Sequence, residues 1–582
     1  MTNTRSGFTK VAAICIAILL VVVIWELGWP LSHAEYEWAR LIAATATLGH
    51  LTGIIGSYFR KEINRPKLRV LIFQIISCLL ILSLIAREQQ ADNFMRFTEL
   101  ARLIITAGLI AVPTLTSLTK IFEWLLRKQK RGRPLMAPAM QFVTSLGFVI
   151  LIGTGLLLLP NSTYAGINLS FTDALFTSTS AVCVTGLNAV NCAMTFTPLG
   201  EIFIITLIQI GGLGIMTFAY FVAMIAGQGF SLRDRVLLTD LLDEDNLGAV
   251  VSFITTIILS TLLIELCGAV LLYFSWQGLD INLMGEPLWW HCLFHAVSAF
   301  CNAGFSTFPM NLMEPGIRLC HSGQAVIMAL IVCGGLGFGI YKELYERLTN
   351  RFFAKHRRLR QQWTPYFKLV VITTGVLLFG GALALFTVSA SHATEPLAQH
   401  FWTCLFDSVT ARTAGFNISD YSQYLPATSL IMCGLMVIGG SPGGTAGGMR
   451  TTTSVIAGAE ILRILRDRDH VEFFHRRIEP RTVARCVITV VVSCAWVGCF
   501  TVLICSLESS MSSLDIFFEN CSAFATVGVS RGITADLGDP SKYLLIINML
   551  AGRAGLFAFL IALAGTPTPR HYRYPSVKIP LT

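Results

Sequence analysis

The chain has 582 residues, of which 54% are hydrophobic and only 13% are charged. This composition is typical of a polytopic membrane protein and excludes a soluble enzyme with one large core. The formal net charge of +9 does not indicate nucleic-acid binding, because the basic residues fall in short loops between apolar segments, where the positive-inside rule accounts for them. The scattered cysteines include no C-x-x-C pair and are predicted to be small buried hydrophobic residues rather than disulfides or metal ligands.

Four apolar segments of about 20 residues, the length that spans a bilayer, occupy the first part of the chain. They are predicted at 11–29, 41–59, 68–86 and 100–118. Basic loops after the second and fourth segments place the N-terminus inside and return the chain to the inside. We interpret the first segment as a retained span rather than a signal peptide, because it ends in Glu26 and Pro30 and lacks a small-residue cleavage pattern.

After Arg133 one pattern recurs four times: an apolar span, a short segment that ends in a glycine bend, and a second apolar span. The short segments are FTSTSAVCVTGL (176–187), FHAVSAFCNAGF (294–305), LFDSVTARTAGF (405–416) and FFENCSAFATVGV (517–529). The first spans are predicted at 141–159, 250–276, 367–388 and 483–507, and the second spans at 199–226, 323–341, 428–464 and 544–563. The short segments cannot cross a bilayer, so each is expected to enter and leave on one side, buried in protein around one axis.

A short helix that stops halfway across a membrane aims its C-terminal carbonyl groups at the centre, where its macrodipole carries about −0.5 charge. The following glycine lets the backbone turn its carbonyl oxygens towards the axis, because glycine has no Cβ. A single glycine after a Ser/Thr run is most often an ordinary helix C-cap. Four glycines in matching positions instead indicate a ring of carbonyl oxygens that replaces the water around an alkali cation.

The glycine-rich stretch IGGSPGGTAGGMRTTT (438–453) interrupts the second span of the third repeat. Each glycine costs a helix interior about 1 kcal/mol and proline about 3 kcal/mol, so the helix is expected to break here. A nucleotide-binding P-loop is disfavoured, since no G-K-[ST] follows and no strand is predicted before the stretch. Broken helices at membrane depth usually mark a transport path.

Arg553 lies near the middle of the last predicted span, about ten residues from either end, too far for its side chain to reach an interface comfortably. We expect it to face the cation path as a barrier. Glu265 and Glu519 are expected to satisfy buried backbone groups or to pair with arginine rather than to bind an ion. Arg412 is expected to brace the third short segment from behind by pairing with Asp407 or Glu519, because a cation inside the path would repel the transported ion.

The motifs VTGL, NAGF, RTAGF and ATVGV, in this order, together with QIGGLGIMT (209–217) and GGLGFG (334–339), resemble those of the Trk/Ktr/HKT superfamily of potassium transporters. The resemblance covers residues 135–582, and the closing YRYPSVKI (572–579) is similar to the C-terminus of the bacterial KtrB/TrkH-type pore subunits. It implies an all-α polytopic membrane protein with four span, pore-helix, span repeats around one central pore. The repeats would occupy 135–230, 231–348, 349–470 and 471–582, after a four-span extension at 1–134.

The resemblance also implies a filter that binds K⁺ through backbone carbonyl oxygens, and a gate beneath it. The filter residues are Val184, Thr185, Gly186, Leu187, Asn302, Ala303, Gly304, Phe305, Thr413, Ala414, Gly415, Phe416, Thr526, Val527, Gly528 and Val529. The gate residues are Gly439, Gly440, Ser441, Pro442, Gly443, Gly444, Thr445, Ala446, Gly447, Gly448 and Arg553. Ser441, Thr445 and the glycine carbonyls would bond to one another or to Arg553 when the path is blocked. Only the fourth filter segment is close to the potassium-channel T-V-G pattern.

The implied function is potassium uptake across the bacterial cytoplasmic (inner) membrane, with both termini inside, sodium as a second candidate ion and no cofactor in this chain. The implied partners are membrane lipid, a second copy in a homodimer, and a cytosolic RCK-type nucleotide-binding regulatory subunit. The connector 342–368, with eight Lys or Arg against two acids, is suited to dock that subunit.

A twelve-span secondary carrier of another solute is the alternative function. It would need no re-entrant glycine segments, so changing the filter glycines separates the two. A membrane sensor or scaffold is a third class, favoured only if the four N-terminal spans are the active part. An enzyme is not indicated, since the sequence contains no H-E-x-x-H motif and no paired catalytic carboxylates.

Overall fold

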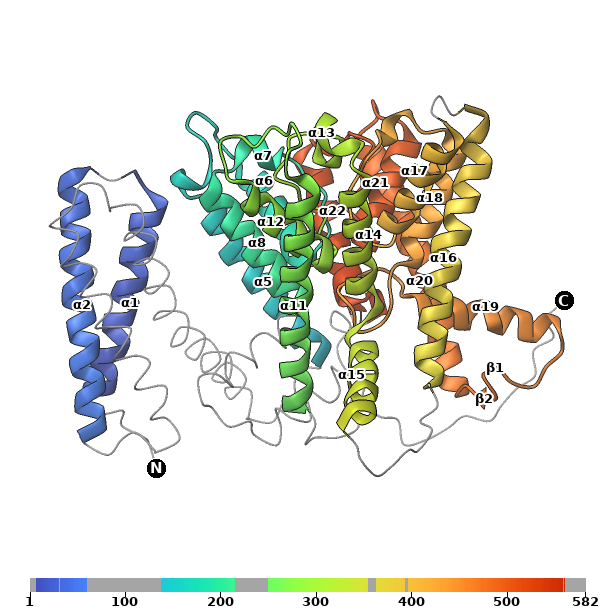
Figure 1. The fold of residues 1–582 in the computed structure, drawn as a ribbon, viewed down its shortest axis with the longest axis horizontal. Coiled ribbons are helices and arrows are strands. Elements are labelled where there is room, and N and C mark those ends of the chain that lie inside the picture. Colours follow the sequence, from blue (N-terminus) through green and yellow to red (C-terminus); the bar gives the residue numbers. More distant parts are fainter. Residues whose placement is uncertain are drawn as a thin grey trace.

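The structure is a computed structural model that describes residues 7–30, 32–59, 138–214, 250–353, 363–392, 396–557 and 559–560. The spans expected at 68–86 and 100–118, the inner end of the span at 199–226 and the motif at 572–579 lie outside the described residues. Figure 1 shows α1 (Gly7–Gly28) and α2 (His33–Phe59) as a pair beside a larger helical bundle. The all-α prediction is confirmed: the regular elements of the described residues are helices, apart from one two-stranded hairpin and one isolated β-bridge.

In the bundle, each predicted repeat contributes a first-span helix, a pore helix and a second-span helix. The first-span helices are α5 (Pro138–Leu157), α11 (Val250–Trp276), α16 (Pro365–Ser389) and α20 (Pro480–Leu507). The pore helices are α6 (Phe171–Cys183), α12 (Leu288–Cys301), α17 (Leu397–Thr410) and α21 (Ser513–Ala525). The second-span helices are α8 (Pro198–Leu213), α14 (His321–Leu336), α18 (Pro426–Ile438) and α22 (Asp539–Ala554).

The remaining elements lie in the connections. At the end of the bundle that holds the pore helices these are α7 (Cys192–Thr195), α13 (Pro315–Arg318), η2 (Pro160–Ser162), η3 (Asn311–Met313), η4 (Ala390–His392) and η5 (Tyr421–Gln423). At the opposite end lie α15 (Phe338–Phe353), α19 (Thr451–Leu465) and the hairpin of β1 (Glu472–Phe473) with β2 (Arg476–Arg477) (Figure 1). The strands pair antiparallel, with Glu472 opposite Arg477.

Membrane-spanning length is met by a subset of these helices. Among the described residues, α11, α16 and α20 are long and apolar enough to cross a bilayer, and α14 with the start of α15 would make a fourth span that is bent by 90°. Several other apolar helices, including α8 and α18, are shorter. These helices are short because the backbone breaks within apolar stretches of the sequence, and the apolar pattern alone does not reveal such breaks.

All four second-span helices end at a glycine with positive φ. These glycines are Gly214 (φ 81°), Gly337 (φ 92°), Gly439 (φ 69°) and Gly555 (φ 82°). A residue with positive φ cannot continue a right-handed helix, and glycine adopts such a φ without strain. The sequence predicted such a break only in the third repeat, so the uninterrupted spans predicted at 323–341 and 544–563 are wrong.

Polar contacts close the repeats into a ring. At each boundary, the fourth residue of a second-span helix bonds to a side chain of the next repeat. The pairs are Glu201 with Trp290 (2.6 Å), Gln324 with Trp402 (2.6 Å), Ser429 with Arg531 (2.7 Å) and Lys542 with Asp173 (2.8 Å). The last pair joins the fourth repeat to the first, so the chain surrounds one axis.

The hydrophobic core packs around the pore helices. Each of them buries a phenylalanine that is at most 1% exposed, and these are Phe176, Phe294, Phe406 and Phe518. At about 25 cal/mol per Å² of apolar surface, such buried aromatic rings make a large contribution to holding the short helices in place. The core therefore fixes where the four pore helices end.

Candidate ion pathway

Each pore helix ends in a tight turn, and the backbone conformation of this turn directs the following residues away from the helix axis. In the first, second and fourth repeats the turn residue is left-handed: Val184 (φ 57°), Asn302 (φ 60°) and Thr526 (φ 51°). In the third repeat the residue with positive φ is instead Thr413 (φ 71°), in a turn that follows the end of α17 at Thr410. The glycines that the sequence predicts for the filter, called the filter glycines below, all have φ between 69° and 93°.

Pore-helix hydroxyls hold the filter backbone. The amide of Gly186 donates to Ser180 Oγ, and that of Gly528 donates to Ser522 Oγ, both at 3.0 Å. In the second and third repeats the hydroxyl donates instead, from Ser298 to the carbonyl of Phe305 (2.8 Å) and from Thr410 to the carbonyl of Phe416 (2.6 Å). Thr410 substitutes for the serine of the other repeats because Val409 stands at the aligned position.

The four filter glycines form a closed ring in chain order. A Cβ built on each glycine would face the carbonyl oxygen of the residue that precedes the next filter glycine. The distances are 2.3 Å from Gly186 to Ala303, 2.7 Å from Gly304 to Ala414, 2.7 Å from Gly415 to Val527 and 2.1 Å from Gly528 to Thr185. These values are far shorter than real Cβ contacts, so the ring closes only with glycine at all four positions.

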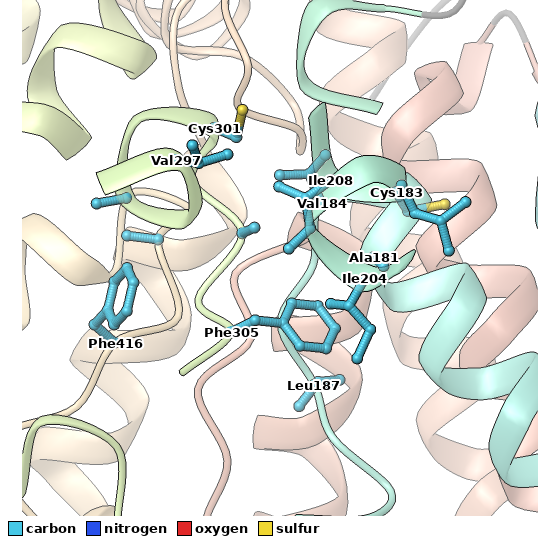
Figure 2. Packing of buried hydrophobic residues seen from close by; sticks show 14 of the residues in the cluster. Ala181, Cys183, Val184, Leu187, Ile204, Ile208, Val297, Cys301, Phe305 and Phe416 are labelled. Atoms are coloured by element: carbon cyan, nitrogen blue, oxygen red, sulfur yellow. The ribbon is translucent and has the colours of Figure 1, made fainter. Parts of the chain in front are cut away.

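The side chains that follow the filter glycines point away from the ring. Leu187, Phe305 and Phe416 are completely buried, and Val529 is 2% exposed. Figure 2 shows Phe305 directed towards Ile204 of α8, within one hydrophobic cluster that also contains Leu187 and Phe416. Because these side chains are packed in the core, the backbone of the filter segments is what remains to face the axis.

Second-span helices support the pore helices through glycine. A Cβ on Gly334 would lie only 1.8 Å from the carbonyl oxygen of Phe300, in the last turn of α12. Gly552 stands in the same relation to Phe524 (1.8 Å), and Gly211 to Val182 (2.1 Å). These contacts were not predicted from the sequence, although the repeated G-x-x-G at 211–214, 334–337 and 552–555 carries their signal.

Two buried carboxylates tie pore helices to the segments after the filter. Asp407 of α17 accepts hydrogen bonds from the hydroxyls of Tyr421 (3.0 Å) and Tyr424. Glu519 of α21 accepts from the hydroxyls of Ser530 and Thr534 and from the amide of Arg531, the last at 3.1 Å. Glu519 thus satisfies a backbone group, the amide of Arg531, which is only partly buried.

The expected partners of Arg412 are wrong. Its Nη1 donates to the carbonyl of Thr374 on α16 (3.4 Å), and it forms an ion pair with neither Asp407 nor Glu519, because hydroxyl and amide donors already occupy both carboxylates. The expectation for Glu265 is also wrong. This carboxylate accepts from the side-chain amide of Gln209 (3.2 Å) rather than from a backbone group or an arginine.

The predicted gate residues 439–448 form a loop between α18 and α19. The amides of Ser441 and Thr445 donate to the carbonyls of Gly335 (3.2 Å) and Gly334 (3.3 Å), where α14 breaks. A Cβ on Gly447 would lie 2.2 Å from Oγ1 of Thr526 in the fourth filter segment. The loop therefore lies directly against the pore-helix side of the filter.

Arg553, near the end of α22, joins this loop to the first repeat. Its Nη1 donates to the carbonyl of Thr445, and its Nη2 donates to the carbonyl of Gly211 at the end of α8. The guanidinium therefore lies between the second-span helices beneath the filter rather than snorkelling to an interface. The contact with Thr445 is the kind that the sequence predicted for a blocked path.

On the other side of the filter, a cavity of about 400 Å³ opens above Gly186, Gly415 and Gly528. Asp420 is the one charged residue among its lining residues in the described part of the chain. The amide and hydroxyl of Ser422 donate to Asp420 Oδ1 at 3.0 and 2.7 Å. These bonds lower the pKa of the Asp420 carboxyl below its ordinary value, so the carboxylate is charged at neutral pH.

Comparison with known proteins places the chain among cation transport proteins. The model of the TrkH family, described as a cation transport protein, matches residues 106–574. The chain is 33% identical over 456 residues to the Ktr system potassium uptake protein B of Bacillus subtilis, covering 75% of this chain and 95% of that protein. It is 33% identical over 472 residues to the potassium/sodium uptake protein NtpJ of Enterococcus hirae, covering 78% and 99%.

A solved structure shares the fold. The potassium transporter TrkH from Vibrio parahaemolyticus aligns with a TM-score of 0.56 at 17% sequence identity, over 86% of this chain and 97% of that one. This likeness supports the helical architecture described above.

Proposed function

The chain belongs to the TrkH family of cation transport proteins, and on this premise we propose that it carries potassium ions into a bacterial cell across the cytoplasmic membrane. Family membership makes the chain a membrane ion transporter rather than an enzyme. Potassium is named for the relative from Bacillus subtilis, and potassium and sodium for the relative from Enterococcus hirae, so sodium is the second candidate ion. The alternation of basic loops supports an orientation with both termini inside.

The observation that carries the proposal is the closed ring of Gly186, Gly304, Gly415 and Gly528. Four pore helices end beside this ring, and each C-terminal end contributes about half a negative charge. Carbonyl oxygens of the filter segments would replace the hydration shell of a cation on the axis. The packing of the following side chains in the core supports this role, since only the backbone is left to line the path.

The gate of the proposed path is the loop 439–448 together with Arg553. The guanidinium bridges two carbonyls beneath the filter, and a positive charge there repels a passing cation. We expect Arg553→Ala to raise cation flux or relax selectivity, measured as Rb⁺ uptake by proteoliposomes. Arg481→Ala is the matched control, because Arg481 is exposed at the start of α20. Equal flux in both variants would remove Arg553 from the gate.

The partners follow the same premise. The relative from Bacillus subtilis is named as part of a Ktr system, which supports a separate regulatory subunit for this chain. We assign it as a cytosolic RCK-type nucleotide-binding subunit, and we expect the transporter to be a homodimer in membrane lipid. Co-purification from a host that expresses both chains tests the first assignment, and the mass of the purified complex tests the second.

The function is tested by growth of a bacterium that lacks its own potassium uptake, at low external K⁺. The wild-type chain, expressed with a candidate regulatory subunit, is expected to restore growth, and Gly415→Asp is expected to abolish it. Gly285→Asp is the matched control: Gly285 also has a positive φ (89°), but nothing lies within 4 Å of its Cβ position.

Rescue by the wild type and by Gly285→Asp alone supports potassium transport through the ring. Rescue by all three chains would remove Gly415 from the path and favour the secondary-carrier alternative. Absence of rescue by every chain, with protein present in the membrane and the regulatory subunit expressed, would count against potassium uptake.

A further inference from the structure

A second ring of polar residues lies outside the four filter glycines. The residue two positions after each filter glycine is polar in every repeat. These residues are Asn188, Ser306, Asn417 and Ser530. All four line the outer cavity of about 400 Å³. Amides from the first and third repeats therefore alternate around the ring with hydroxyls from the second and fourth.

The two hydroxyls are already engaged by pore helices. Ser306 Oγ hydrogen-bonds to Nε2 of His295 (2.9 Å) and accepts from the amide of Phe308 (3.0 Å). Ser530 donates its hydroxyl to Glu519 and accepts from the amide of Gly532 (2.8 Å). Both hydroxyl oxygens are therefore already hydrogen-bonded within the protein and are less available to a ligand in the cavity.

The side-chain amide oxygens of Asn188 and Asn417 are less engaged than the hydroxyls of Ser306 and Ser530, and so are more available to a ligand. Asn417 uses its Nδ2 group, which donates to Met313 Sδ (3.3 Å), while its Oδ1 accepts no hydrogen bond within the described residues. Asn188 Oδ1 accepts only from the thiol of Cys192 (3.5 Å), a weak donor. Opposite sides of the cavity therefore each offer a carbonyl oxygen with little competition.

Charge in the cavity favours a cation. Asp420 lies three residues after Asn417, and its carboxylate is exposed to the cavity. The positive charge of Arg531 also acts on Asp420, but Arg531 is itself paired with Asp515 (2.6 Å), and its Nη groups donate to the carbonyls of residues 421, 422 and 424. A single net negative charge thus remains at the mouth of the path.

We propose that Asn188, Asn417 and Asp420 form a capture site that holds a partly hydrated monovalent alkali cation outside the filter. Alkali cations prefer hard oxygen ligands, which two amides and a carboxylate supply, and the cavity has room for the ion with part of its water. The site raises the cation concentration at the filter and removes part of the hydration shell before the ion reaches the glycine ring. This inference rests on the proposed cation uptake.

Rb⁺ uptake by proteoliposomes, as a function of Rb⁺ concentration, tests the site. Asp420→Asn is expected to raise KM about three- to tenfold with little change in the maximal rate, because a lost charge weakens capture but leaves the filter intact. The matched control is Asp280→Asn, which removes an exposed carboxylate from an outer loop that does not line the cavity. Added choline chloride is expected to shrink the difference between wild type and Asp420→Asn by screening.

The amides are tested separately. Asn417→Ala is expected to raise KM, and Asn417→Asp, which adds a charged oxygen at the same place, is expected to lower it. Opposite changes in these two variants distinguish cation binding from damage to the filter, which would impair both.

Three results would overturn the proposal. Equal KM values for Asp420→Asn and Asp280→Asn would show that the Asp420 carboxylate is not part of a capture site. The proposed cation uptake would then still stand. Inhibition of the wild type by external Ca²⁺ that is lost in Asp420→Asn, with an unchanged KM for Rb⁺, would assign the site to a divalent cation. Absence of uptake by the wild type itself would remove both the proposed function and the capture site.

Discussion

Gly334→Ala is the sharpest test of how the second-span helices support the filter. The new Cβ would lie 1.8 Å from the carbonyl oxygen of Phe300 and 3.0 Å from Oγ1 of Thr445. Neither helix can yield locally, because the first contact joins the backbone of α14 to the backbone of α12. The two helices must therefore separate by more than an ångström, which displaces the end of α12 two residues before Asn302.

The expected energy is a difference of two terms. Overpacking of this kind typically costs about 1–3 kcal/mol, or more when backbone must move. Replacing glycine by alanine inside a helix recovers up to about 1 kcal/mol. We therefore expect a net loss of about 1–2 kcal/mol in the free energy of unfolding, together with a marked loss of uptake, because the displaced carbonyls lie under the filter.

Thermal unfolding of the purified protein and Rb⁺ uptake by proteoliposomes measure the two effects. The control is Gly434→Ala in α18, another second-span helix, where nothing lies within 4 Å of the Cβ position. That variant is expected to be unchanged or slightly more stable. If Gly334→Ala unfolds at the same temperature and transports at the same rate as Gly434→Ala, the support that we infer from this contact does not exist.

Three further predictions concern the outer side of the filter. Arg531→Gln, which removes an ion pair and four hydrogen bonds to the loop and helix of the third repeat, is expected to lower the free energy of unfolding by about 3 kcal/mol. Glu519→Gln is expected to lower the preference for K⁺ over Na⁺ in flux assays, because the amide nitrogen replaces one of the two oxygens that together accept three hydrogen bonds. Ser422→Ala is expected to raise the pKa of Asp420, so that the low-KM state, which needs the carboxylate, is lost at a higher pH as the medium is acidified.

Each of these has a contrary outcome. Arg463→Gln is the control for Arg531→Gln, because it removes a more exposed ion pair with Glu460. It is expected to lower the free energy of unfolding by less than about 1 kcal/mol. An equal loss in Arg531→Gln would show that the additional contacts of Arg531 do not stabilise the fold. Unaltered selectivity in Glu519→Gln would remove its role behind the fourth segment. A KM profile for Ser422→Ala that coincides with the wild type between pH 3 and pH 7 would show that Asp420 does not control cation affinity.

The filter glycines could be predicted from the sequence because the same segment occurs four times, and only a ring uses four copies in matching positions. The breaks at Gly214, Gly337 and Gly555 could not, since a glycine in an apolar run is compatible with a continuous helix until its φ is known. The partners of Arg412 were predicted wrongly for a different reason. Asp407 is near in sequence, but its oxygens are occupied by two tyrosine hydroxyls from the loop after the filter.

The outer cavity shows the same limit. Asn188 and Asn417 lie in different repeats, and no spacing along the chain indicates that they face one space with Asp420. The repeat alignment does reveal that the second position after each filter glycine is polar. That signal was present in the sequence and became meaningful only when the four segments were seen to meet.

The central claim is that cations pass through the ring formed by Gly186, Gly304, Gly415 and Gly528. Crystals of the protein grown in Tl⁺ or Rb⁺, with anomalous density measured along the axis, test it most directly. The account predicts peaks on the axis beside the carbonyl oxygens of the filter segments, and their loss in Gly415→Asp but not in Gly285→Asp. Transport-competent protein with anomalous density elsewhere in the bundle and none at the ring would contradict it.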